Sequence, residues 1–269
     1  MIKSPQFTFK TFLMVLVTLL FGCKKEEKRT FDFIFTSSIE SRLNMNEYFP
    51  ITVGNGDYTI KVKDETILDA YFTNTANAHF GAIRIQGKKK GETTVTITDN
   101  VIQSTREVQV KITDSYLPFA ISKSNHPTLT KAMHIFLVNN TKKDAYFFLQ
   151  KGNDLNFKQK GTFEFIAELK EGVKTPFLLL TYSTDEKGQL TASSDKAVTH
   201  KFDLTGSDRQ VYNALVSIFG VNWELTPTTK TSPIDIPYLN MKEVGTDLRV
   251  SGLIGGTSPF DYIPPGYLD

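Results

Sequence analysis

Apolar and polar residues alternate along much of the chain, and this alternation predicts strands. An apolar side chain occupies every second position in four runs, namely residues 58–62, 83–85, 93–98 and 108–112. A strand with one buried face shows this period of two, because successive side chains point to opposite faces. The turn-forming segments 54–57, 87–91 and 99–100 punctuate the runs. Short strands at this spacing predict a β-sandwich over residues 46–114, which includes a strand-like run at 51–53.

Residues 127–269 carry a second β-rich pattern. Two strand-like runs, 133–138 and 145–149, flank the turn-forming residues 139–144 and predict a hairpin. Further strands are expected at 162–169, 176–182, 198–204 and 247–253, with a tight turn at 185–188. Prolines bias the preceding residue away from helix, so we place the connection between the two domains in the proline-containing segment 115–126.

One helix is expected in the second domain, at about residues 208–219. Ser207 and Gln210 fit a capping box, in which each side chain bonds the backbone amide of the other residue. The apolar residues Val211, Leu215 and Ile218 then recur at helical spacing. Gly220 is suited to end the helix in a left-handed conformation. The fold class predicted for the chain is therefore mainly all-β, a sandwich followed by a β-rich domain with one α-helix.

The first 22 residues have the organisation of a secretory signal peptide. Lys3 and Lys10 precede an uncharged apolar segment, residues 11–22. A bilayer-spanning helix needs about 20 apolar residues, so this segment is too short to be a permanent anchor. Cleavage after residue 22 removes two basic residues and leaves 29 basic and 29 acidic ones. The mature chain is then neutral, which gives no electrostatic reason to expect nucleic-acid binding.

The sequence Leu20-Phe21-Gly22-Cys23 resembles the lipobox of bacterial lipoproteins. The resemblance implies cleavage before Cys23 and attachment of lipid to its thiol, and it departs from the usual pattern at Phe21, where a small residue is typical. Cys23 is the only cysteine of the chain, so the mature protein has no disulfide. The resemblance also implies an N-acyl chain on Cys23, and a thioether-linked lipid together with an N-acyl chain suffices for stable membrane attachment. Residues 23–45 would form the lipidated tether and a lead-in containing a short strand at 31–36.

The charged residues after the cysteine indicate a destination. Lys25, Glu26 and Glu27 resemble the export tag of Bacteroidetes lipoproteins, which implies the outer face of the outer membrane. The alternative is that these residues are a solvated tether and that the protein faces the periplasm. We therefore expect an outer-membrane lipoprotein, at the cell surface or otherwise facing the periplasm.

Residues 46–113 are similar to the bacterial immunoglobulin-like group 2 family. The similarity rests on the turn at 54–58, the segment 64–67, and the run 85–97, in which a glycine-bracketed turn leads into a threonine- and valine-rich strand. It implies an immunoglobulin-like sandwich. It implies no catalytic residue, because domains of this kind serve adhesion, spacing and display.

Motifs for catalysis, metals and cofactors are absent. The four histidines, His79, His126, His134 and His200, show no metal-ligand spacing, and His134 and His200 lie in strand-like runs. No nucleophile elbow, phosphate loop or dinucleotide fingerprint occurs. We expect no metal, no cofactor and no enzymatic activity. A hydrolase whose acids, such as Glu164 and Glu168, are dispersed along the sequence is the alternative of another class.

Aromatic side chains supply the weak ligand-contact candidates. Flat rings can stack on the apolar faces of sugars, but each such ring is more often part of a core or a loop anchor. The candidates are Tyr146, Trp223, Tyr238, Tyr262 and Tyr267. We expect a non-catalytic module that binds a protein or a glycan, or a subunit of an envelope glycan-uptake or fimbrial complex.

Overall fold

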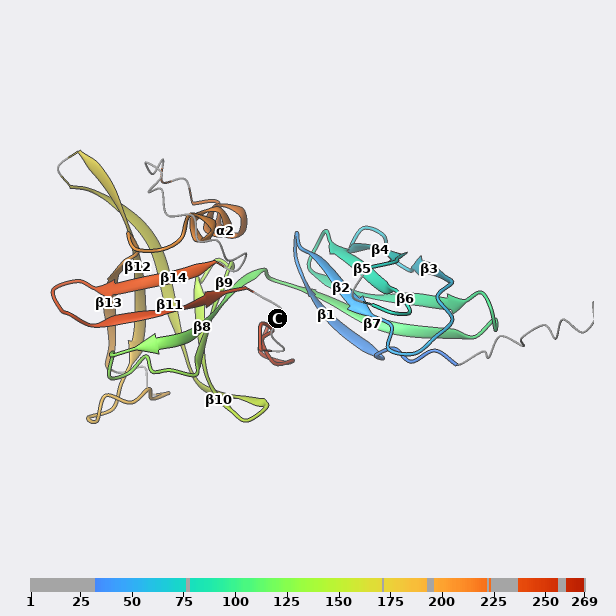
Figure 1. Ribbon diagram of the computed structural model, residues 1–269, viewed down its shortest axis with the longest axis horizontal. Coiled ribbons are helices and arrows are strands. Elements are labelled where there is room, and N and C mark those ends of the chain that lie inside the picture. The colour runs from blue at the N-terminus through green and yellow to red at the C-terminus, as the bar shows by residue number, and fades with distance from the viewer. Residues whose placement is uncertain are drawn as a thin grey trace, which may run out of the picture.

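The computed structural model describes residues 32–75, 78–170, 172–192, 196–221, 223, 237–255 and 260–268. Within these ranges the elements are fifteen strands and one helix, so the prediction of a mainly all-β fold is confirmed. The strands form a four-stranded sheet, a three-stranded sheet and a closed barrel of eight strands. Figure 1 shows the two small sheets together on one side and the barrel on the other. No helix in the described ranges is long and apolar enough to cross a bilayer.

The two small sheets enclose one core, and we call this unit the sandwich. The four-stranded sheet has the order β1-β7-β6-β3, with β1 parallel to β7, and the three-stranded sheet has the order β2-β5-β4. Aliphatic residues of both sheets, such as Ile39, Ile83 and Val110, share a single buried cluster. The strands are β1 (Ser38–Arg42), β2 (Asn46–Pro50), β3 (Tyr58–Val62), β4 (Leu68–Thr73), β5 (Ala82–Gly87), β6 (Gly91–Asp99) and β7 (Thr105–Thr113).

The barrel closes in the order β10-β11-β12-β13-β14-β15-β8-β9, and its neighbouring strands are antiparallel. Pairing of β15 with β8 closes the ring, so no barrel strand is left as a sheet edge along its whole length. The barrel strands are β8 (Tyr116–Ser124), β9 (Met133–Val138), β10 (Asp144–Lys151), β11 (Asp154–Lys170), β12 (Val173–Ser183), β13 (Ala197–Asp203), β14 (Tyr238–Glu243) and β15 (Arg249–Ile254).

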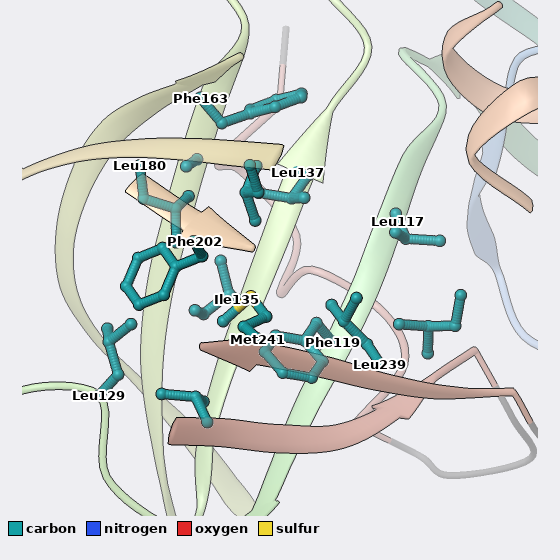
Figure 2. Packing of buried hydrophobic residues seen from close by; sticks show 14 of the residues in the cluster. Leu117, Phe119, Leu129, Ile135, Leu137, Phe163, Leu180, Phe202, Leu239 and Met241 are labelled. Atoms are coloured by element: carbon teal, nitrogen blue, oxygen red, sulfur yellow. The ribbon is translucent and has the colours of Figure 1, made fainter. Parts of the chain in front are cut away.

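The barrel interior is packed with apolar side chains. Phe119, Ile135, Phe202 and Met241 come from four different strands and converge there, as Figure 2 shows. Burying each such side chain contributes about 1.5–3 kcal/mol relative to leaving it in water. Gly252 lies at the closing seam, where an added Cβ would overlap the carbonyl oxygen of Ala120 on β8. The close approach of these two strands therefore requires glycine at this position.

The helix forms where the sequence predicts it, but its start differs. α2 spans Arg209–Phe219, buries Val211 and Leu215, and ends at Gly220 with φ of 66°. The expected capping box is wrong: the N-cap is Asp208, and no side chain caps the helix. Ser207 instead exchanges hydrogen bonds with the backbone of Asn240, since its Oγ donates to the carbonyl and accepts from the amide. The serine hydroxyl is thus used to fix β14.

Several strand expectations are confirmed and others are wrong. The 133–149 hairpin forms as β9 and β10, and the turns at 99–100 and 185–188 form as well. The expected connection at 115–126 is wrong, because residues 116–124 are β8 and pair with both β9 and β15. The lead-in contains one unpredicted strand, β1, and a second unpredicted strand, β2, follows it at the start of the sandwich. The strands expected at 51–53 and 31–36 are wrong, because the described residues of these runs form only a bridge between Ile34 and Val53.

Candidate functional site

The sandwich and the barrel are joined by two residues, Asp114 and Ser115. β7 ends at Thr113 and β8 begins at Tyr116, so the chain passes almost directly from one strand to the next. Asp114 Oδ2 lies 2.7 Å from Lys90 Nζ of the sandwich. The Ser115 carbonyl accepts from the backbone amide of Asn139 in the barrel at 2.8 Å. Both connecting residues are therefore held, one by each unit, which removes the freedom that a longer linker would allow.

Next to this connection the sandwich carries a buried ion pair between Arg42 and Glu47. Arg42 Nη2 and Nε lie 2.7 and 2.8 Å from Glu47 Oε1. Glu47 Oε2 also accepts from Ser41 Oγ at 2.7 Å and from the Arg42 backbone amide at 2.8 Å. Burial lowers the pKa of Arg42, but the charge and hydrogen bond of Glu47, together with Tyr116 and Tyr262, outweigh burial, and the pKa of Arg42 is raised above its usual value. Each carboxylate oxygen has a strong donor, as a buried charge requires.

Two tyrosines from the barrel side cover the guanidinium of Arg42. Its Cζ atom lies 5.0 Å from the centre of the Tyr116 ring and 5.5 Å from that of Tyr262. Burial raises the pKa of Tyr116, so this ring stays neutral and offers its face to the cation. A hollow of about 230 Å³ remains beside these rings. The ion pair of the sandwich is thus also a contact with the barrel side.

The C-terminal segment, residues 260–268, reinforces this contact. Ile263 and Leu268 pack against Phe136 and Phe148 on the outer face of the barrel. The Leu268 carbonyl accepts from Lys111 Nζ of the sandwich at 2.8 Å. Figure 1 shows the C-terminus between the two units. We call the set Arg42, Lys111, Asp114, Ser115, Tyr116, Tyr262 and Leu268 the joint.

The structure places the five predicted aromatic candidates mostly in anchoring roles. Tyr146 and Trp223 are each only 7% exposed. Tyr146 Oη donates to the Tyr267 carbonyl, so this pair fastens the C-terminal segment to β10. Trp223 packs against Phe165 and against Tyr212 of α2, as expected for a ring beneath the helix.

The two remaining candidates also have local partners. Tyr238 Oη lies 2.7 Å from Ser122 Oγ, a contact between β14 and β8. Tyr262 belongs to the joint, and its ring is partly open to solvent. These five rings therefore form no shared sugar platform. Cys23, Lys25, Glu26 and Glu27 lie outside the described residues.

A second polar group lies inside one end of the barrel, and we call it the barrel-end cluster. Its members are His126, Tyr182, His200 and Glu243. His200 Nδ1 lies 2.7 Å from Glu243 Oε1, and His126 Nε2 lies 3.7 Å from Glu243 Oε2. The Tyr182 ring stacks on His200 with centroids 4.4 Å apart. The four residues are far apart in sequence, so their meeting could not be seen from motif spacing.

Two histidines and a glutamate within 4.8 Å of one another suggest a metal site, but the tautomer of His126 does not fit one. His126 Nδ1 accepts from the backbone amides of Thr128 and Leu129, both at 3.1 Å. A nitrogen that faces two donors carries no proton, so the proton of the neutral ring is on Nε2. A histidine that binds metal through Nε2 instead donates from Nδ1. His126 is therefore a donor directed towards Glu243.

The barrel-end cluster is incompletely bonded. His126 Nε2 and Tyr182 Oη are buried and have no hydrogen-bond partner within the described ranges. Burial lowers the pKa of His126, an effect that Glu243 opposes and His200 reinforces. Burial also raises the pKa of Tyr182. Both rings are therefore held in their neutral forms, which is the cheaper state for a buried group that lacks a full set of partners.

The hydrolase alternative requires two opposed carboxylates in a pocket. A hollow of about 380 Å³ beside β3 and β4 is lined by Glu65 and Asp69, but Asp69 is ion-paired with Lys88. Of the sequence pair Glu164 and Glu168, the latter is paired with Lys201. These described acids do not form the arrangement that a glycosidase needs, and the absence of enzymatic activity stays a prediction.

Comparisons with known proteins add little. No protein-family model and no curated protein matches the chain. Among solved structures, domains 5–6 of the S-layer protein SbsC share 12% identity over 82% of this chain and 98% of that one, with a TM-score of 0.26. Domains 4–9 of the same surface layer protein also share 12% identity, over 84% of this chain and 31% of that one, again with a TM-score of 0.26. A TM-score this low supports no conclusion, and the immunoglobulin-like group 2 resemblance stays a prediction.

Proposed function

We propose that the chain is a non-catalytic envelope lipoprotein in which a rigid sandwich holds a β-barrel binding module at a fixed position relative to the membrane. The lipid on Cys23 anchors the protein, and the charged residues that follow it serve as a tether. The sandwich is the spacer. The barrel presents the surface that binds a protein or a glycan.

The observation that carries this proposal is the joint. A two-residue connection with an anchor on each side, a covered ion pair and a C-terminal brace all oppose bending between the two units. Interdomain motion is the default where such contacts are lacking. A chain that served only as a flexible tether would gain nothing from these contacts, whereas a spacer that sets a distance depends on them.

A projecting ribbon of the barrel supports the binding role. Pairing of β11 with β10 ends at Thr162, and pairing of β12 with β13 ends at Phe177, whereas β11 and β12 stay paired beyond these points. Leu169 and Val173 on this ribbon are 70% and 61% exposed. Exposed apolar side chains on a projecting element are typical of contact surfaces. Figure 1 shows the ribbon extending away from the barrel.

The anchor is tested by the intact mass of the protein purified from membranes. We expect loss of residues 1–22 and the added mass of a diacylglyceryl and an acyl group on Cys23. Cys23→Ser, the matched variant, should remain uncleaved and carry no lipid. An intact leader or a free thiol in the native protein would contradict the proposal.

The binding role is tested by crosslinking in intact cells. The double variant Leu169→Glu, Val173→Glu should lose the partner that the native protein captures, because charge on the ribbon opposes burial of an apolar contact. Val101→Glu, at an exposed apolar position of the sandwich, is the control and should keep it. Equal capture by all three proteins would refute a role of the ribbon. Protease treatment of the same cells distinguishes the outer face from the periplasmic face.

A further inference from the structure

The outer face of the three-stranded sheet carries an aromatic ladder, which we define as Tyr48, Arg84 and Tyr71. The three residues lie directly opposite one another on β2, β5 and β4. The guanidinium carbon of Arg84 lies 5.9 Å from the centre of the Tyr48 ring and 5.1 Å from that of Tyr71. Cross-strand contacts of this kind stabilise the sheet. They also hold the three side chains in fixed positions on one surface.

Arg84 is a positioned cation without a counter-charge among the described residues. Its Nε and Nη2 atoms both donate to Asn46 Oδ1, at 3.1 and 2.7 Å. It forms no ion pair with any residue that the structure describes. The acidic residue in the next row of the same face, Asp69, is occupied by Lys88 at 2.5 Å. A guanidinium oriented by a neutral amide and two rings is suited to receive a carboxylate from a ligand.

The rings on either side of this cation are open. Tyr48 is 52% exposed and Tyr71 is 41% exposed, whereas most other aromatic side chains that the structure describes are buried or half-buried. An open tyrosine face can stack on the apolar face of a sugar ring, and the neighbouring amides of Asn46 and Gln86 can bond its hydroxyl groups. The face offers no group of exposed aliphatic side chains such as a peptide anchor requires.

We propose that the aromatic ladder binds an acidic polysaccharide, with a uronate carboxylate on Arg84 and neighbouring pyranose rings on Tyr48 and Tyr71. A single cation on a formally neutral mature chain favours such a ligand over nucleic acid, whose binding depends on many phosphate contacts. The site lies on the sandwich and not on the barrel. It is independent of the lipid anchor and of the ribbon described above.

Calorimetric titration of the detergent-solubilised full chain tests the proposal. The probes are oligomers of galacturonate, glucuronate and mannuronate, and the methyl ester of each, which keeps the ring but removes the charge. We expect at least one uronate oligomer to bind and its ester to bind about tenfold more weakly, the effect of losing one charge-assisted hydrogen bond. Arg84→Gln should reproduce this loss with the free acid and should bind acid and ester equally.

Two further variants separate stacking from charge. Tyr48→Ala and Tyr71→Ala should weaken binding of acid and ester alike. Arg106→Gln is the control, because Arg106 is an exposed arginine of the same unit whose charge is already paired with Asp32 at 2.8 Å. The proposal is overturned if none of the three oligomers binds, if acid and ester bind equally to the native chain, or if Arg84→Gln has no more effect than Arg106→Gln. Binding of anionic phospholipid vesicles without binding of any oligomer would assign the face to the membrane and also overturn it.

Discussion

The sandwich holds the buried carboxylate of Glu47 and the barrel holds the partly buried carboxylate of Glu243, and the two are bonded differently. Glu47 accepts four hydrogen bonds of 2.7–2.8 Å from Ser41 and Arg42. Glu243 has one short partner, His200, and a distant one, His126, at 3.7 Å. Glu47 is therefore held in one position by its hydrogen bonds, whereas Glu243 is held less tightly. The fully bonded carboxylate, that of Glu47, holds Arg42 of the joint, where position matters most to the proposed function.

The first and largest effect is expected from breaking the buried ion pair. Arg42→Ala leaves Glu47 buried without its counter-charge and should cost about 3–5 kcal/mol of unfolding free energy. Circular dichroism in a urea titration reports both units, whereas the fluorescence of Trp223, the only tryptophan, reports the barrel. We expect the larger shift in the transition that circular dichroism assigns to the sandwich.

The exposed ion pair between Lys88 and Asp69 supplies the control for that substitution. Lys88→Ala should cost at most about 1 kcal/mol, because solvent screens an exposed pair. A similar cost for the two substitutions would mean that the Arg42–Glu47 pair has no special structural role.

The second prediction breaks the barrel and spares the sandwich. Gly252→Ala places a Cβ against the Ala120 carbonyl and must push β15 away from β8. We expect a loss of about 1–3 kcal/mol, read from the midpoint of the Trp223 fluorescence transition. Gly206→Ala is the matched control, because its Cβ would make only an ordinary contact with Asn240. If both glycine variants unfold at the native midpoint, the closing seam is not as tight as the structure indicates.

The third and smallest effect is the contribution of His126 to the pH dependence of stability. Its pKa is lowered from 6.5 by burial, so the unfolded chain takes up this proton first as the pH falls. The contribution of neutral His126 is therefore complete above about pH 6.5 and is lost as the pH falls through the folded-state pKa.

His126→Asn keeps an oxygen that can accept from the amides of Thr128 and Leu129 but removes the titrating ring. Urea midpoints at pH 7.5 and 5.5 should differ less for this variant than for the native chain. His134→Gln is the comparison, since burial also lowers the pKa of His134 on a different part of the barrel. If the midpoints of His126→Asn at the two pH values differ as much as those of the native chain, His126 does not contribute to the pH dependence of stability.

Local pattern predicted much of the fold. β3, β6 and β7 alternate strictly because one face of each meets the sandwich core, and the 133–149 hairpin has a clear turn. The prolines of 115–126 bias the preceding residues away from helix and predict a connection there, yet residues 116–124 form β8, in which Pro118 lies in the ladder opposite Phe136. β1 and β2 are only five residues each, too short for their alternation to stand out.

The sites were much harder to predict, because they depend on contacts between distant residues. The aromatic ladder joins three strands through register, and a one-residue shift would turn its members to the other face. His126, His200 and Glu243 meet only because the barrel closes. The cue that the sequence did offer is the alternation over residues 83–85, which places Arg84 on the polar side of its strand.

A distance distribution measures most directly whether the joint holds the sandwich and the barrel in one relative position. Spin labels are attached at Glu92→Cys on β6 and Lys158→Cys on β11, two exposed positions. The background is Cys23→Ser, which has no other thiol. Pulsed electron paramagnetic resonance then measures the distance between the label on the sandwich and the label on the barrel. We predict one narrow distribution of label-to-label distances for the native joint. A broad distribution is expected after insertion of the four residues Gly-Ser-Gly-Ser between Asp114 and Ser115. A native distribution as broad as that of the insertion variant would show that the joint does not fix the two units relative to each other.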